Sequence, residues 1–169
     1  MAVDYLGPMM SAWLMCVKDH LSKPVGRALV MPGNSVVWDD CCDGQLWVRI
    51  ISIVGVSNLS NQATQPCNPL YQVRVGIGVL RCAHTVDDAG RIPTPAQMTA
   101  DAFQTYQDRA DMVEAIVCCI SPLVEEDHRM GTLRIEDWLP LGVDGGCVGG
   151  EITVTVNSIL CTPCEEILP

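Results

Sequence analysis

The stretch that decides the fold is Leu70-Tyr-Gln-Val-Arg-Val-Gly-Ile-Gly-Val-Leu-Arg-Cys82. Its apolar residues alternate with polar or very small ones, and this period of two is typical of a β-strand with one face against a core. Glycines inside a strand leave room for a close approach, which we expect from a packed helix or from a neighbouring subunit's backbone. The two faces carry Val73, Val75, Ile77 and Val79 on one side and Gln72, Arg74, Gly76 and Gly78 on the other.

Other segments on both sides of this stretch have strand character. Gln45–Val54 is dense in β-branched residues, and Ile152–Leu160 alternates apolar with polar residues. Leu133–Leu141 is predicted to be extended and closed by Pro140, and Val36–Trp38 to be a short strand. The connections we expect are a turn through Met31–Asn34, a long polar loop at Gly55–Pro69 and a glycine-rich hairpin at Gly145–Gly150.

Two helices are predicted. The first has Met10, Trp13, Leu14, Val17 and Leu21 at helical spacing and ends at Ser22-Lys23-Pro24. The second begins at Thr94-Pro95-Ala96-Gln97, where a capping threonine, a proline at the first helical position and a glutamine three residues after the cap form a capping box. It is expected to reach about Cys119, with Met98, Ala102, Tyr106, Val113 and Val117 among its apolar positions, before an exposed connection at Glu125–Gly131.

These elements predict one α+β domain over residues 1–169, with 161–169 as a C-terminal tail. The sheet is expected to be mixed or antiparallel, with about four to five strands, and flanked by two α-helices. A length of 169 residues suits a single core, and a composition of 49% hydrophobic and 18% charged residues argues against a disordered chain.

The formal net charge of −10 disfavours tight binding to a phosphate backbone. The sequence has no run of lysine and arginine and no alternation of aromatic with basic residues. The amino terminus lacks the pattern of a secretory signal, and Leu46–Val56 is too short and too charged for a membrane span, so we expect a soluble protein.

Ten cysteines in a chain without a secretory signal are expected to be mostly buried or incidental thiols in a reducing cytoplasm. Cys161-Thr-Pro-Cys164 has redox-motif spacing, but it follows a terminal strand instead of opening a helix. Zinc bound with the help of Cys41, Cys42 and Cys67 remains an alternative, although adjacent cysteines chelate poorly and the chain has no second Cys-x-x-Cys.

No catalytic, cofactor or metal site is expected, and we expect the chain not to be an enzyme. The acidic doublets Asp39-Asp40 and Asp87-Asp88 lie beside turn glycines, where aspartate makes local hydrogen bonds. None of the three histidines has a nucleophile at motif spacing, and Gly145–Gly150 lacks the lysine of a phosphate-binding loop.

The order of elements resembles the tail terminator proteins of long, non-contractile-tailed bacteriophages, particularly those that infect actinobacteria. Four structural phrases carry the resemblance, and together they cover most of residues 10–160. They are Cys42-Asp-Gly-Gln-Leu-Trp-Val-Arg49, Val79-Leu-Arg-Cys82, Pro93-Thr-Pro-Ala-Gln97 and Pro140-Leu-Gly-Val-Asp-Gly-Gly-Cys147-Val-Gly-Gly150.

The resemblance implies a virion protein, made in the host cytoplasm, that forms a hexameric ring at the head–tail junction. Such a ring sits on the last ring of the tail tube protein, ends polymerisation of the tube and docks on the head-side connector, while genomic DNA passes through its lumen without specific binding. An acidic ring suits that passage, because its lumen does not grip phosphates. The cysteine-rich end at 161–169 is not part of the family's pattern.

Loops are the expected contact surfaces, because long loops in compact domains are often functional. The candidate interface residues are Asn58, Asn61, Gln62, Gln65, Asn68, Asp87, Asp88 and Arg91. Two alternatives stay open: a head–tail stopper or adaptor of the same junction, and a small cysteine-rich metal-binding module.

Overall fold

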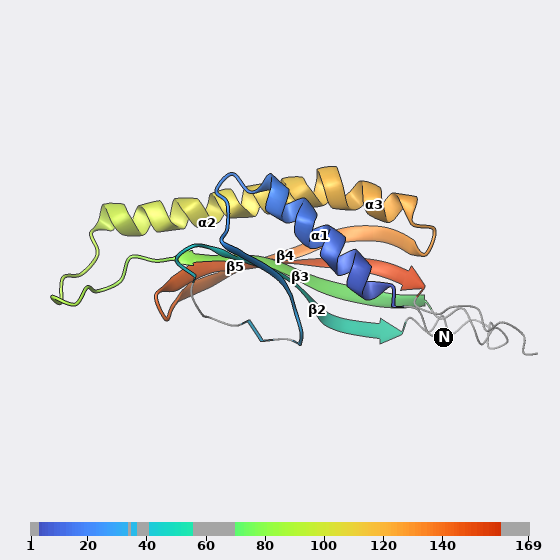
Figure 1. The fold of residues 1–169 in the computed structure, drawn as a ribbon, viewed down its shortest axis with the longest axis horizontal. Helices are drawn as coiled ribbons and strands as arrows, with labels where there is room; N and C mark the ends of the chain where they lie inside the picture. The colour runs from blue at the N-terminus through green and yellow to red at the C-terminus, as the bar shows by residue number, and fades with distance from the viewer. Residues whose placement is uncertain (1–3, 34, 37–40, 56–69, 160–169) are drawn as a thin grey trace, which may run out of the picture.

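A computed structural model describes residues 4–33, 35–36, 41–55 and 70–159. It confirms an α+β fold: a five-stranded mixed sheet with the described helices over one face (Figure 1). The elements are α1 (Leu6–His20), β1 (Arg27–Met31), β2 (Gln45–Gly55), β3 (Leu70–Cys82), α2 (Pro95–Ala115), the π-helical turn η1 (Ile116–Ile120), α3 (Ser121–Glu126), β4 (Met130–Asp144) and β5 (Cys147–Ile159).

The strand order is β1-β2-β3-β5-β4. All pairs are antiparallel except β1 with β2, which is parallel. Strand β1 is not predicted, and it includes Met31, the first residue of the predicted turn Met31–Asn34. Its five residues lie between Gly26 and Pro32 and do not alternate, so the local pattern does not reveal a strand that is specified by pairing with β2. In the predicted strand Val36–Trp38, Val36 is irregular and 37–38 lie outside the described residues.

The main core lies between the helices and one face of the sheet. The predicted inward face of β3 is confirmed, since Val73, Val75, Ile77 and Val79 are all fully buried. Trp13 of α1 is also buried, at 1% exposure, and it packs in the same cluster. Burying apolar area stabilises the fold by about 25 cal/mol per Å².

The second helix runs further than predicted. It continues through η1 and α3 to Glu126, so the exposed connection begins two residues later than expected. Pro122 stands at the first turn of α3, directly after the π-helical turn. A π-turn shifts the hydrogen-bond register by one residue and lets a helix absorb a proline that an unbroken α-helix would reject.

The β4–β5 hairpin is tighter than predicted, since only Gly145 and Gly146 form the turn, both with positive φ. Gly150 lies within β5, where a Cβ would meet the Trp138 ring. Strand β4 also continues through Pro140, which is tolerated because β4 pairs on one side only and proline needs no ladder donor at a sheet edge.

The cysteines correct the expectation of free thiols. Six of them form the disulfides Cys16–Cys119, Cys41–Cys147 and Cys42–Cys82, which join positions 103, 106 and 40 residues apart. Pairing depends on which strands and helices meet, so it does not follow from cysteine spacing alone. Cys67, Cys161 and Cys164 lie outside the described residues.

The face of the sheet away from the helices carries a small second cluster and a buried ion pair. Trp47 is fully buried there with Met31 and Leu80. Its indole Nε1 donates to Glu151 Oε2 at 2.7 Å, and Arg49 binds the same carboxylate through Nε and Nη2, each at 2.7 Å.

The strand glycines of β3 leave space for these buried side chains. A Cβ at Gly76 would meet the Glu151 carboxylate, and a Cβ at Gly78 would meet the Trp47 ring. What approaches these glycines is therefore side chains of adjacent strands on the same sheet face. This corrects the expectation of a packed helix or a neighbouring subunit's backbone.

Candidate assembly surface

Among the described residues, the longest run of exposed residues lies in the loop before α2, and the exposure continues into the first turns of that helix. Every residue from His84 to Ile92 and from Thr94 to Ala100 is exposed. Figure 1 shows this loop and the start of α2 reaching past the ends of the central strands. We call residues 84–106 the α2 arm.

The start of the arm's helix is fixed by the predicted capping box, which is confirmed. Gln97 N donates to Thr94 Oγ1 at 3.3 Å, while Thr94 N donates to Gln97 Oε1 at 2.9 Å. Pro95 occupies the first helical position with its φ already set. The helix can therefore begin without packing against the sheet.

A second set of contacts ties the loop to the helix. His84 N donates to Asp101 Oδ2 at 2.8 Å, and its ring Nδ1 lies 2.8 Å from Asp101 Oδ1. Asp87 Oδ1 accepts from the backbone of Ala89 and Arg91, and Arg91 Nε donates to Asp87 Oδ2 at 2.7 Å. The arm is thus held by its own hydrogen bonds.

Several large apolar side chains of the arm are exposed. Exposed apolar side chains that form a contiguous patch mark sites that bind a protein, a membrane or a ligand. Phe103 is the only phenylalanine in the chain, and its side chain is among the most exposed. The exposed members are Val86 (57%), Ile92 (78%), Met98 (60%), Phe103 (66%) and Tyr106 (56%).

The surface continues from α2 onto edge strand β4. The rings of Tyr106 and Trp138 meet edge to face with centroids 6.2 Å apart, and the Arg109 guanidinium lies 6.0 Å from the Trp138 centroid. Leu139, the next residue of β4, is 60% exposed. Trp, Tyr, Phe, Met and Arg are the residue types enriched at protein–protein interfaces.

The apolar residues of this helix do not all mark its packed face. Met98, Tyr106 and Val117, three of the apolar positions named from the sequence, are more than half exposed. The buried face instead combines Met112, Ala115, Ile116 and Ile120 with polar Thr105, Asp108 and Asp111. A helix face that includes buried carboxylates has no regular apolar period, so the sequence pattern does not identify this face.

The predicted interface residues separate into two groups. Asp87, Asp88 and Arg91 lie in the α2 arm and are exposed. The backbone hydrogen bond from Arg91, together with its guanidinium contact, holds the pKa of the Asp87 carboxyl below its ordinary value. The other predicted residues, Asn58, Asn61, Gln62, Gln65 and Asn68, lie outside the described residues, as does Asp39-Asp40.

No protein-family model matches the sequence, and no curated protein is similar to it. The chemical character of the arm is given by its own side chains. These are apolar and aromatic, with charged groups at Asp87, Asp88, Arg91 and Arg109 around them.

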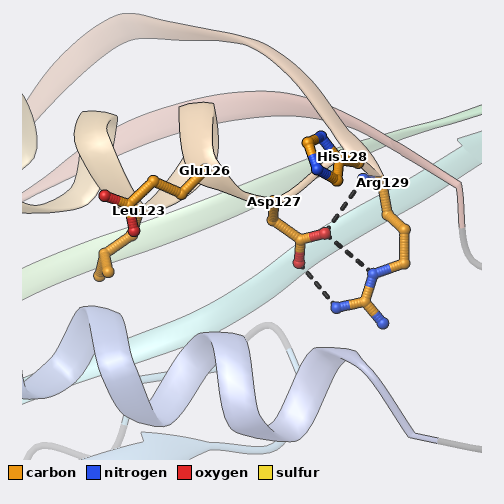
Figure 2. A pocket seen from close by; sticks show the side chains of 5 residues that line it. All are labelled: Leu123, Glu126, Asp127, His128 and Arg129. Atoms are coloured by element: carbon orange, nitrogen blue, oxygen red, sulfur yellow. Dashed lines mark hydrogen bonds and ion pairs between the residues drawn. The ribbon is translucent and has the colours of Figure 1, made fainter.

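A shallow hollow lies at the far end of the long helix (Figure 2). Its lining includes Leu123 and Glu126 of α3 and the turn Asp127–Arg129 that follows. Arg129 donates to Asp127 from Nε at 2.9 Å and from Nη2 at 2.8 Å, and this hydrogen bonding lowers the pKa of the Asp127 carboxyl.

One carboxylate of the hollow is already paired. Arg129 neutralises Asp127 and lies 4.0 Å over the Tyr5 ring, and His128 is exposed and forms no hydrogen bond with that pair (Figure 2). Its aspartate is therefore committed to an ion pair.

Two further features concern ligands and membranes. Within the described residues, no three or more histidine, cysteine, aspartate or glutamate side chains are grouped to hold a metal ion. None of the described helices has the length and apolar character needed to cross a bilayer.

Proposed function

We propose that the chain is a structural virion protein, a tail terminator that forms a hexameric ring at the head–tail junction. In that role it caps the tail tube, ends its polymerisation and joins it to the head-side connector. The chain acts by protein–protein contact and not as an enzyme.

The observation that carries the proposal is the α2 arm, an ordered projection that exposes Ile92, Met98 and Phe103. A closed ring needs two different surfaces per subunit, one that projects and one that receives it. The arm supplies the projecting surface, because it extends from one end of the domain and has its own hydrogen bonds. We assign it to the contact with the neighbouring subunit.

The charge of the chain supports the same role. A net charge of −10 spread over each subunit gives a ring an acidic character, and an acidic lumen repels the phosphates of passing DNA at distances that salt does not screen. Genomic DNA then passes through without specific binding. The tube protein and the connector are the remaining partners.

The first test is the mass of the purified chain in solution and its shape in negative stain. We expect the wild type to form rings and the double variant Met98→Ser/Phe103→Ser to remain monomeric with an unchanged unfolding midpoint, because both side chains point to solvent in the monomer. Val117→Ser, at a 55% exposed position on the same helical rod but outside the arm, is the matched control and should still form rings.

The second test locates the protein in particles. An epitope tag on the carboxyl terminus should be labelled only where the tail meets the head. Tube length separates the terminator from a stopper or adaptor: loss of a terminator gives overlong tubes, whereas loss of a stopper leaves tubes of normal length unattached to heads. Particles that contain no copy of the chain would overturn the assembly role, and stoichiometric zinc bound by cysteines would then favour the metal-binding module.

A further inference from the structure

Four cysteines lie together where the turn before β2 meets the ends of β3 and β5. Cys41 and Cys42 are consecutive in that turn, and they bond to Cys147 and Cys82 respectively. Cys82 and Cys147 are register partners in the β3–β5 ladder. Two neighbouring disulfides therefore fasten one turn to two adjacent strands.

The two disulfides differ in access to solvent. Cys41 and Cys147 are 3% and 2% exposed, and they pack in the small cluster around Trp47. Cys42 and Cys82 are both exposed. Because exchange requires a thiolate to reach a sulfur atom, a reductant in solution attacks the outer Cys42–Cys82 bond and not the inner Cys41–Cys147 bond.

The register provides a route from the outer bond to the inner one. Directly opposed residues of an antiparallel pair have Cα atoms about 4.5–5.5 Å apart and project to the same face. That separation lies within the range of about 4.4–6.8 Å that a disulfide spans. A thiolate on Cys82 is therefore placed to attack the sulfur of Cys147.

We propose that Cys42–Cys82 is a thiol–disulfide exchange site for an external dithiol, and that its opening is passed to the buried Cys41–Cys147 bond. One thiolate of the dithiol attacks Cys42 Sγ, forming a mixed disulfide and releasing Cys82 as a thiolate. Cys82 then attacks Cys147 Sγ, forming Cys82–Cys147 and releasing Cys41, which takes up a proton.

The second thiol of the reductant resolves the mixed disulfide. The oxidised reductant leaves, and Cys42 takes up a proton. One dithiol is thereby oxidised, two disulfides are replaced by one, and two thiols appear on adjacent residues. A single two-electron reduction thus frees the turn from both strands, whereas simple reduction of the outer bond would leave it attached through Cys41.

The step has a structural consequence at Trp47. Cys41 is part of the cluster that covers this fully buried indole, together with Met31 and Leu80. Once Cys41 is no longer bonded to Cys147, that side of the cluster is held by packing and by the turn's backbone contacts, such as Gly26 N to Asp43 O at 2.7 Å. The inference concerns the single chain and does not depend on ring formation.

The test uses the full oxidised chain and dithiothreitol as the dithiol. The native chain is first mapped by peptide mass spectrometry, which should recover Cys41–Cys147 and Cys42–Cys82. Dithiothreitol at one molar equivalent is then added, the reaction is quenched with acid, and free thiols are alkylated. We expect alkyl label on Cys41 and Cys42, together with a new peptide pair linked by Cys82–Cys147.

The matched control is Cys82→Ser, which keeps the inner bond but removes the attacking thiol. In this variant, label on Cys41 after one equivalent should fall to background. Label on Cys42 and Cys82 with Cys41–Cys147 intact in the wild type would overturn the exchange step. A native chain in which these four cysteines are unpaired would overturn the site itself.

Discussion

The two halves of α2 differ in which residues they bury and which they expose. The half in the arm exposes Met98, Phe103 and Tyr106, while the half over the sheet buries Asp108 and Asp111. Buried carboxylates persist only when donors satisfy them, and exposed apolar groups persist when a partner covers them. The helix therefore makes internal hydrogen bonds through buried polar side chains at one end and exposes apolar side chains at the other.

The internal end depends most on one ion pair. Arg81 binds Asp108 through Nε at 3.0 Å and Nη2 at 2.9 Å, and it also donates to the carbonyls of Lys23 and Pro24. Both side chains are about 95% buried. The arginine thus connects β3, α2 and the segment after α1.

The largest effect is expected for Asp108→Ala. It leaves the buried Arg81 charge without its partner, so the free energy of unfolding should fall by about 3–5 kcal/mol in urea denaturation. Asp87→Ala, which removes an exposed pair in the arm, is the control and should not move the midpoint. Equal losses of stability from the two substitutions would contradict the difference between the buried pair and the exposed pair.

A smaller effect is expected for Asp111→Ala. The Asp111 carboxylate accepts from Ser22 N at 2.7 Å, from Ser22 Oγ at 3.0 Å and from Gln107 Nε2 at 2.8 Å. Its removal should cost about 1–3 kcal/mol, because the Ser22 backbone donor loses its acceptor. Ser22→Ala removes only the hydroxyl and should cost less, as measured by the same denaturation. A greater loss in Ser22→Ala would contradict this assignment.

Thr94→Ala tests whether the arm is held by its own cap. Loss of the capping oxygen should destabilise the helix by about 1 kcal/mol. Since the first turns do not pack on the sheet, the loss should appear as faster amide exchange confined to the start of α2. Thr99→Ala removes only a bond to the Pro95 carbonyl and serves as the control. Uniformly faster exchange over the whole molecule would argue against a separately held arm.

The smallest effect concerns pH and the loop of the arm. The pKa of Asp87 is lowered in the folded chain by hydrogen bonds from Arg91, relative to an ordinary value of 3.8. The stability that this carboxylate gives the loop is fully present above pH 3.8 and is lost as pH falls through the lowered value. The amide resonances of Ala89 and Arg91 should therefore hold steady down to about pH 4 and shift only in stronger acid. A shift centred above pH 3.8 would contradict the lowered pKa.

Sequence pattern predicted the elements whose local period matches their environment. Strands β2 and β3 begin at the predicted residues, and the capped start of α2 is correct, because alternation and capping chemistry are local properties. The parallel strand β1 is not predicted, since five residues without alternation are specified by their partner. The predicted helix ends too early, because helix propensity does not account for a π-helical turn that is followed by Pro122.

The candidate surface was predicted only in part. The predicted interface residues Asp87, Asp88 and Arg91 lie in the loop of the arm, but the prediction names no residue of the helix beside it. The same helix contains Asp108 and Asp111, and both carboxylates are on its buried face. Which side of α2 faces the sheet depends on Arg81 and Ser22, which lie far away in the sequence.

The continuity of α2, η1 and α3 gives the molecule a mechanical element. A helical rod from Pro95 to Glu126 is roughly 45–50 Å long, and it is anchored beyond the arm by Asp108, Asp111 and the Cys16–Cys119 bond. A stiff beam that is fixed along one part and free at its tip transmits a load instead of absorbing it. Force applied at the arm is therefore carried through those anchors into β3, into the segment after α1 and into α1 itself.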